Sequence, residues 1–151
     1  MPPTFRIATE NDLPAIFALM ADDEISRARE GHQATVTPNA LAAFREIDAD
    51  ANNELWVAEL DGAVIATLQL TFIPGLARDG LKRAQVESVR VHSDHRSQGV
   101  GEKLLEAAMD RARARGCAMM QLTTDTRRAA AQRFYGRLGF EPTHVGMKRK
   151  L

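Results

Sequence analysis

Between Glu87 and Leu105 the chain reads Glu-Ser-Val-Arg-Val-His-Ser-Asp-His-Arg-Ser-Gln-Gly-Val-Gly-Glu-Lys-Leu-Leu. The first residues have the pattern of a short apolar strand, a polar loop follows, and an amphipathic helix begins near Gly99. A helix start presents unpaired backbone N–H groups and a partial positive charge, and Gly99 and Gly101 let an anion approach the backbone closely. The stretch therefore predicts a socket for a phosphorylated ligand.

The surrounding sequence alternates strand and helix patterns. Strands are expected at 5–8, 55–60, 63–73, 85–91 and 117–124, followed by a final extended segment from Phe140. Helices are expected at about 13–20, 38–50, 99–115 and 127–138, and residues 22–38 have the pattern of a loop or a broken helix. Asp61-Gly62 predicts an antiparallel hairpin, whereas strand–helix–strand units usually return parallel. This order predicts an α/β fold with a mixed sheet, helices on both faces, and the glycine turn at the carboxyl end of its strand.

Length and composition are those of an ordinary globular chain. At 151 residues it has the size of one domain, residues 1–151, with a substantial core. The amino terminus lacks the basic start and apolar run of a signal peptide, and no window approaches the roughly 18 apolar residues that span a membrane. The one cysteine, Cys117, excludes an internal disulfide and fits a reducing compartment. We therefore expect a cytoplasmic location and no membrane association.

The formal net charge is zero, but the two halves differ. Residues 1–75 hold 4 basic and 12 acidic residues, a balance of −8, and residues 76–151 hold 16 and 8, a balance of +8. The basic half contains the glycine turn, which suits a polyanionic ligand, although solvated helix faces explain the asymmetry equally well. The helix arginines lack interleaved aromatic residues for base stacking, so nucleic acid is not an expected partner.

Two common phosphate motifs do not fit the turn. A P-loop requires Gly-x-x-x-x-Gly-Lys-Ser/Thr, which Lys103-Leu104 does not supply. A dinucleotide fingerprint requires a third glycine where Leu104 stands. A Gly-x-Gly at a helix start is weak evidence when taken alone.

A second segment makes the pattern specific. Arg96-x-x-Gly99-x-Gly101 follows the strand, and Ala131-Gln-Arg-Phe-Tyr-Gly-Arg-Leu-Gly-Phe140 follows later. Together they resemble the two motifs of the GNAT superfamily of acyl-CoA-dependent N-acetyltransferases, in the expected element order along essentially the whole chain. The resemblance implies a GNAT-type α/β fold with a mostly antiparallel sheet, and acetyl-CoA as co-substrate without a metal.

The resemblance also implies roles for individual residues. The backbone of Val89, Arg90 and Val91 would hydrogen-bond the pantetheine arm where two parallel strands splay apart. The pyrophosphate would be cradled by the segment made of Arg96, Ser97, Gln98, Gly99, Val100, Gly101 and Glu102. One position departs from the pattern: Arg128 stands where many relatives carry Asn, so its role is left open between a cofactor phosphate and solvent.

Acetyl transfer to an amine needs a base and an acid. An alkylamine has a pKa near ~10, so a base must remove its proton at neutral pH. Glu87 matches a position used as a base in several GNAT enzymes; the alternative is a carboxylate ion-paired with Lys82, Arg83 or Arg90. Tyr135, the only tyrosine, matches the position that protonates the departing thiolate; the alternative is simple packing beside Phe134. The Val89 N–H is expected to polarise the thioester oxygen.

Other candidate groups are given structural roles. Cys117 opens a strand far along the chain from the expected thioester position, so a buried thiol is favoured over an acetyl carrier. His92, Asp94 and His95 lie in a loop without further ligands nearby, so a solvated turn is favoured over a metal site.

The acceptor is the least defined part of the prediction. The region between the first two helices contains Asp22, Asp23, Glu24, Arg29 and Glu30, with Asp48 and Asp50 further on. Such an acidic region would attract a cationic amine. We therefore expect an N-acetyltransferase that acts on a primary amine, small molecule or peptide, by direct attack in a ternary complex. The alternatives are a non-catalytic acyl-CoA-binding regulatory module and a transferase that acts on a protein or aminoacyl-tRNA, and a homodimer is the assembly that many relatives form.

Overall fold

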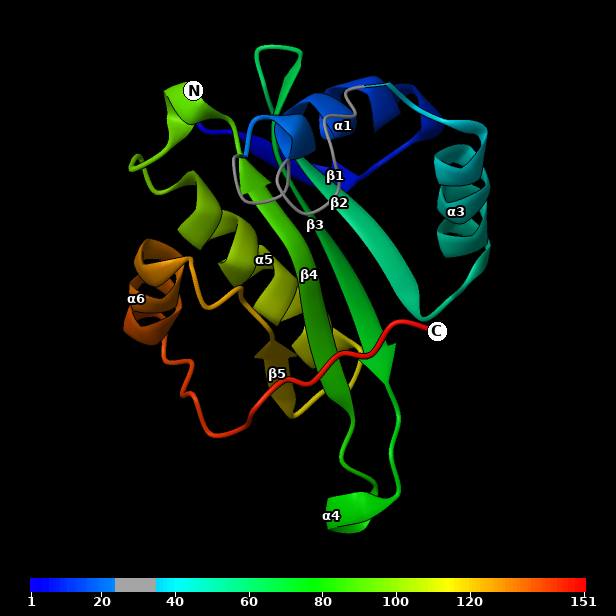
Figure 1. Cartoon of the computed structure of the whole chain (residues 1–151), viewed down its shortest axis with the longest axis vertical. Helices are drawn as coiled ribbons and strands as arrows, with labels where there is room; N and C mark the ends of the chain where they lie inside the picture. Colours follow the sequence, from blue (N-terminus) through cyan, green and yellow to red (C-terminus); the bar gives the residue numbers. More distant parts are fainter. Residues whose placement is uncertain (24–34) are drawn as a thin grey trace.

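The computed structural model describes residues 1–23 and 35–151 (Figure 1). Its sheet has five strands in chain order, β1 (Thr4–Ile7), β2 (Asn53–Leu60), β3 (Ala63–Ile73), β4 (Arg83–Val91) and β5 (Met119–Leu122). The pairs from β1 to β4 are antiparallel, and β5 runs parallel to β4. The predicted mixed, mostly antiparallel sheet is confirmed, as is the parallel return after a strand–helix–strand unit.

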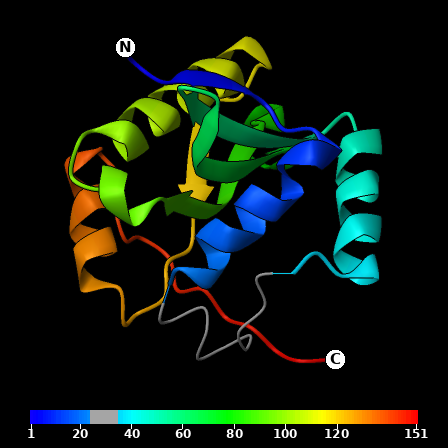
Figure 2. The same cartoon turned by 90° about the horizontal axis from the view of Figure 1, so that it is seen from above.

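Helices cover both faces of the sheet (Figure 2). One side carries α1 (Leu13–Ala21) and α3 (Pro38–Ala49), and the other carries α5 (Val100–Ala114). The helix α6 (Ala129–Arg137) packs against the α5 side. Short helical turns are η1 (Glu10–Asp12), α4 (Ala77–Gly80) and η2 (Ser93–His95). Within the described ranges, every helix is too short or too polar to cross a bilayer.

The alternation of side chains along the strands divides the core between the two faces. Leu55 and Val57 of β2 point toward α1 and α3, where they pack with Ile16 and Phe44. The next residue, Ala58, points the other way, into a larger cluster built from β3, β4 and α5. The members of that cluster with no more than 1% exposure include Leu68, Leu70, Phe72, Val86, Leu104 and Leu105.

The final segment differs from its prediction. Residues 140–151 form no strand, and the strand expected at 117–124 covers only Met119–Leu122. Three apolar residues of the segment, Val145, Met147 and Leu151, are 87%, 91% and 119% exposed, so nothing in the described chain buries them. An apolar pattern therefore does not become a strand here, because a strand also needs a neighbour to pair with.

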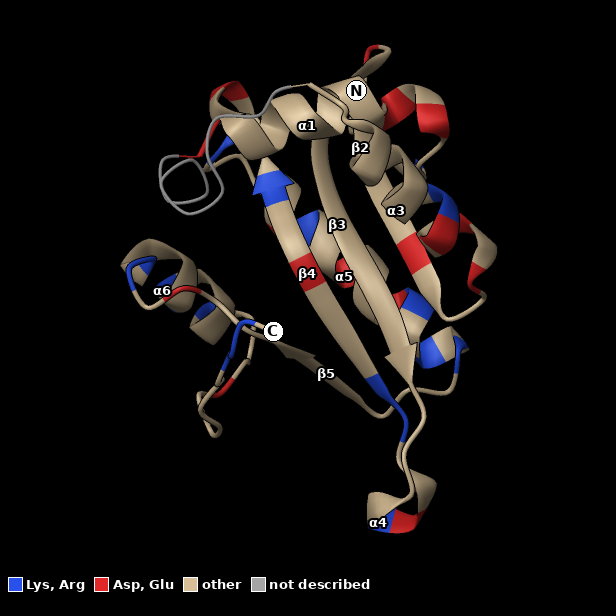
Figure 3. Cartoon of the chain, turned by 45° about the vertical axis from the view of Figure 1, so that its right-hand side comes forward, with Lys and Arg blue, Asp and Glu red and all other residues tan. Residues whose placement is uncertain are grey.

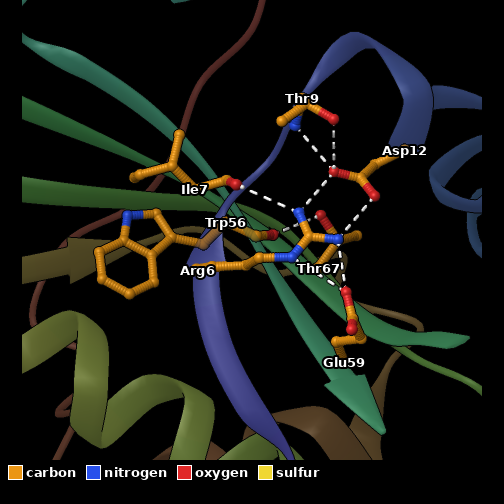
Figure 4. A network of polar contacts seen from close by, with 7 residues as sticks. All are labelled: Arg6, Ile7, Thr9, Asp12, Trp56, Glu59 and Thr67. Atoms are coloured by element: carbon orange, nitrogen blue, oxygen red, sulfur yellow. Dashed lines mark hydrogen bonds and ion pairs between the residues drawn. The ribbon is translucent and has the colours of Figure 1, made fainter. Parts of the chain in front are cut away.

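Arg6 of β1 joins carboxylates from two other elements (Figure 4). Its guanidinium donates to Asp12 at 2.7 and 2.9 Å and to Glu59 at 2.6 and 3.0 Å. Asp12 also accepts from the Thr9 N–H at 2.7 Å, which closes a capping box where η1 leads into α1. Hydrogen bonds from Arg6 hold the pKa of the buried Asp12 carboxyl below its ordinary value. The network fixes the position of α1 on the sheet.

This network predicts an acid-sensitive contribution to stability. The folded-state pKa of Asp12 is lowered, so its contribution is present above the ordinary aspartate pKa of about 4 and is lost as the pH falls through the folded-state value. Asp12→Asn should lower the free energy of unfolding at neutral pH by about 1–3 kcal/mol, because Arg6 loses its buried partner. Urea unfolding at several pH values should find that this difference shrinks below about pH 4.

The matched control is Asp110→Asn on α5. Asp110 pairs with Arg113 at 2.9 Å, but both side chains are exposed, so the loss should stay below about 0.5 kcal/mol. Equal losses in the two variants, or an Asp12→Asn effect that does not change with pH, would contradict the assignment.

Candidate active site

The strands β4 and β5 pair over only four residues each. The parallel pairing runs from Arg83 with Met119 to Val86 with Leu122, whereas β4 continues to Val91 (Figures 1 and 3). The predicted splaying of two parallel strands is therefore confirmed. Residues 87–91 line the opening, and their backbone edge receives no hydrogen bonds from β5.

A bulge in β4 sets which side chains face the opening and which face the core. Gln69 pairs with Glu87 and Thr67 pairs with Arg90, so Leu68 alone lies opposite both Ser88 and Val89. Ser88 adopts a positive φ of 54°, as bulged residues can. Val89 and Val91 consequently pack against the α5 core, while Glu87 and Arg90 share the opposite face.

Glu87 is exposed at the start of the opening. The side chain of Lys82 is bound to the Arg115 carbonyl at 3.0 Å, and that of Arg90 pairs with Asp23. Within the described part of the chain, no ion pair joins Glu87 to Lys82, Arg83 or Arg90, so the alternative ion-pair role is not observed. Its carboxylate is thus available to accept a proton.

The glycine turn joins β4 to α5. Gly99 has a φ of 80° at the N-cap of α5, and Ser97 has a φ of 60°. The Lys103 N–H donates to the Gly99 carbonyl at 3.1 Å, so the N–H groups of residues 100–102 precede the first helical hydrogen bond. A side-chain carbon added at Gly99 would meet no other atom within 4 Å, so there is open space beside the turn at this residue.

Three of the predicted segments meet at Gly101. A carbon added there would lie 3.5 Å from Val91 of β4 and 3.5 Å from Phe134 of α6. The end of the strand, the first turn of α5 and the Phe-Tyr helix therefore converge on one place. The two motifs that carry the family resemblance lie 33 residues apart in sequence, counted from Gly101 to Phe134, and adjoin in the fold.

The polar side chains of the turn brace its backbone. Arg96 donates to the Val91 carbonyl and to the Asp22 carbonyl, each at 3.1 Å, and lies 3.6 Å from the Asp22 carboxylate. Gln98 donates to the Asp94 carbonyl at 2.9 Å. The His92 ring accepts from the Asp94 N–H at 3.2 Å, consistent with a role in the turn. The side chains of Arg96, Gln98 and His92 are therefore engaged in hydrogen bonds with neighbouring backbone groups.

Tyr135 lies on α6 between two phenylalanines. The centroid of its ring is 5.3 Å from that of Phe134 and 5.9 Å from that of Phe140. Burial raises the pKa of the phenol, and the positive charges of Arg90 and Arg128 act in the opposite direction. The phenol is therefore protonated at neutral pH, which is the form that can donate a proton.

Three of the described acidic residues that were predicted to attract a cationic acceptor have other partners, and no hydrogen bond or ion pair to a described residue is found for the fourth, Asp48. Asp22 pairs with Arg96, and Asp23 pairs with both Arg90 and Arg128. Glu24, Arg29 and Glu30 lie outside the described residues, and Asp50 accepts from Asn52 and Asn53 at the end of α3. The role of Asp23 was missed in the sequence, and the departure at Arg128 was the one signal that could have indicated it.

Cys117 lies away from this site. Its side chain belongs to the α5 core, and the residue is 9% exposed. Burial raises the pKa of the thiol, which keeps it in the unreactive protonated form. This placement agrees with the predicted structural role.

A row of polar side chains crosses the face of the sheet beside Glu87. Strand pairing places Asn53, Thr71, Gln85 and Gln121 next to one another on four successive strands. Thr71 donates to Asn53 at 2.7 Å, and Gln121 donates to Gln85 at 2.6 Å. We call these four residues the polar row. They give this half-buried part of the sheet a neutral, hydrogen-bonding surface.

Comparison with known proteins agrees with this geometry. The model of the acetyltransferase (GNAT) family matches residues 15–140. The L-methionine sulfoximine/L-methionine sulfone acetyltransferase of Pseudomonas aeruginosa is 38% identical over 93% of this chain and 81% of its own length. The L-amino acid N-acyltransferase MnaT of Escherichia coli is 29% identical over 93% of this chain and 80% of its own length.

Solved structures show the same fold. A Bacillus halodurans protein described as a transcriptional regulator is 44% identical with a TM-score of 0.93, and the match covers 99% of each chain. A putative acetyltransferase of Agrobacterium tumefaciens is 25% identical with a TM-score of 0.83, over 98% of this chain and 99% of that one. The family match, the curated relatives and the structural neighbours agree with the two motifs and the splayed strands, and the chain belongs to the acetyltransferase (GNAT) family of acyltransferases.

Proposed function

We propose that this protein transfers an acetyl group from acetyl-CoA to a primary amine by direct attack in a ternary complex. The observation that carries the proposal is the open edge of β4 at residues 87–91, which leads toward the N-terminus of α5. An extended pantetheine arm can add to such an edge as another strand would. The positive end of α5 then favours the pyrophosphate at the far end of the arm.

The donor site is made mainly of backbone. The carbonyls of Val89 and Val91 already accept from the side chains of Arg90 and Arg96, at 2.9 and 3.1 Å. We therefore assign contacts with the arm chiefly to N–H groups of this segment, including that of Val89 at the thioester oxygen. The N–H groups from Ser97 to Glu102 would hold the pyrophosphate.

The side chains then supply acid and base. Glu87 accepts the proton of the attacking amine, directly or through water, and the nitrogen bonds to the carbonyl carbon. The carbon–sulfur bond breaks, and Tyr135 donates its phenol proton to the departing sulfur. The protonated state of Tyr135 at neutral pH supports this division of roles.

The acceptor we propose is the amino group of an amino acid or a close analogue. The polar row offers neutral hydrogen-bonding groups, and the described acidic residues Asp22 and Asp23 are occupied by arginines. Arg83 lies on the same face of β4 as Glu87, and its buried Nε has no hydrogen-bond partner within the described ranges, which suits a carboxylate. The names of two relatives, which refer to L-amino acids and to methionine derivatives, point the same way.

Thiol release from acetyl-CoA tests the proposed function. An enzyme of this kind should release thiol in the presence of L-amino acids or methionine sulfone faster than with polyamines or without an acceptor. A non-catalytic regulatory module would bind acetyl-CoA and release none with any amine. That outcome would favour the alternative suggested by the neighbour described as a transcriptional regulator.

Gly99→Val should abolish tight acetyl-CoA binding. The added side chain would occupy the open space beside Gly99, where the pyrophosphate is proposed to bind, so affinity measured by calorimetry should fall at least tenfold, or about 1.4 kcal/mol. The matched control is Gly116→Val at the other end of α5. Gly116 has the same positive φ, 81°, and equally open space, so both variants carry similar backbone strain. Equal affinities in the two variants would contradict the location of the socket.

Glu87→Gln should lower turnover in a manner that depends on pH. Loss of a general base should reduce kcat by about 100-fold at neutral pH, and the defect should shrink as the pH rises toward the pKa of the acceptor amine, which then loses its proton without help. The pH profile of kcat checks this expectation. Glu106→Gln, an exposed change on α5, should leave the profile unaltered. A defect of constant size across the pH range would remove Glu87 from the role of base.

A further inference from the structure

Asp23, which follows α1, binds arginines from two other elements. Its carboxylate oxygen lies 3.6 Å from the guanidinium of Arg90 on β4 and accepts a short hydrogen bond from Arg128 at the start of α6. The three side chains are only 15%, 15% and 20% exposed. This cluster ties the end of α1 to β4 and to the start of α6.

The same two arginines act on Tyr135. Arg128 is the N-cap residue of α6, the short helix that carries Tyr135, and the positive charge of Arg128 acts on the phenol together with that of Arg90. Burial raises the pKa of the Tyr135 phenol because it disfavours the charged phenolate. The positive charges of Arg90 and Arg128 lower the pKa because they stabilise the phenolate. The charged groups around the phenol within the described ranges are thus Arg90 from β4 and Arg128 from α6, with Asp23 from the end of α1 holding both. Phe134 and Phe140, which pack on its ring, carry no charge.

We propose that Arg90 and Arg128, anchored by Asp23, are positioning residues that support proton donation by Tyr135. The proposal rests on the proposed function. When the amine nitrogen bonds to the carbonyl carbon and the carbon–sulfur bond breaks, the sulfur takes the phenol proton and Tyr135 is left as a phenolate. A buried anion is costly unless cations lie near it, and the two guanidinium groups are those cations. The amine proton passes to Glu87, and solvent afterwards returns a proton to Tyr135.

The protein offers a direct test because Tyr135 is its only tyrosine. Tyrosinate absorbance, followed as the pH is raised, therefore titrates this one group without any substrate. Arg128→Gln and Arg90→Gln should each move the midpoint upward by roughly half to one pH unit, the effect of removing one nearby cation. In Arg128→Lys, which keeps the positive charge, the midpoint of the Tyr135 titration should stay close to that of the wild type.

The matched control is Arg127→Gln, one residue away. Arg127 pairs with Asp125 at 2.8 Å and does not act on Tyr135, so the midpoint should not move. Circular dichroism confirms that each variant is folded before it is titrated. In turnover assays, Arg128→Gln should lower kcat with little change in KM for acetyl-CoA, and it should have no further effect in a Tyr135→Phe background.

The outcomes separate this inference from the proposed function. An unchanged midpoint in both Arg128→Gln and Arg90→Gln, relative to Arg127→Gln, would overturn the inference even if the wild type releases thiol rapidly. Additive losses of kcat for Arg128→Gln and Tyr135→Phe would also overturn it, because the arginine would then act independently of the phenol. If the midpoints move upward in the arginine variants but the wild type releases no thiol from acetyl-CoA with any amine, the proposed function and its proton-transfer step would be overturned. The electrostatic link between the arginines and Tyr135 would stand.

Discussion

The parting of β4 from β5 after Val86 is the constraint on which the rest of the site depends. Backbone N–H and C=O groups need hydrogen-bond partners. Because β4 continues beyond the last residue that pairs with β5, the edge of β4 at residues 87–91 has no partner strand. The fold meets part of this need with arginine side chains on the Val89 and Val91 carbonyls. The donors that remain lie beside the start of α5, whose dipole and free N–H groups favour an anion. A ligand that is extended at one end and phosphorylated at the other fits both features at once.

The electrostatics of the site depend on two consecutive residues at the end of α1. Asp22 holds Arg96 of the glycine turn, and Asp23 holds Arg90 and Arg128 near the phenol. One helix end thereby supports both the glycine turn and the surroundings of Tyr135. The position of α1 itself depends on Arg6, which joins β1 to Asp12 and to β2. The network around Arg6 is therefore a structural support for residues at the other end of the helix.

The parts of the fold that could be predicted from the sequence are those with local causes. The Asp61-Gly62 turn, the periodicity of α5 and the glycine at its start each act within a few residues, and the structure has these elements where they were expected. The cluster around Asp23 could not be predicted in this way, because Arg128 is 105 residues distant in sequence and only tertiary packing brings the two together. The conformation of the segment after Phe140 could not be predicted either. Its pattern favours a strand, but a strand forms only where another strand is available to pair with it.

The bulge at Ser88 changes which residues of β4 lie on which face of the sheet. Before the bulge the odd-numbered residues lie on the face of Glu87, and after it the even-numbered residues do. In a regular strand, Glu87 and Arg90 would point to opposite faces, and Val89 and Val91 would share the face of Glu87. With one extra residue opposite Leu68, both charged side chains reach the same side and both valines reach the core. The same residues in a regular strand without the bulge would therefore place Arg90 in the apolar layer and turn two valines away from it, although every residue type needed for the site would still be present. The spacing along β4 is thus as much a part of the site as the side chains, and alignments that shift a gap across this position would pair residues from opposite faces.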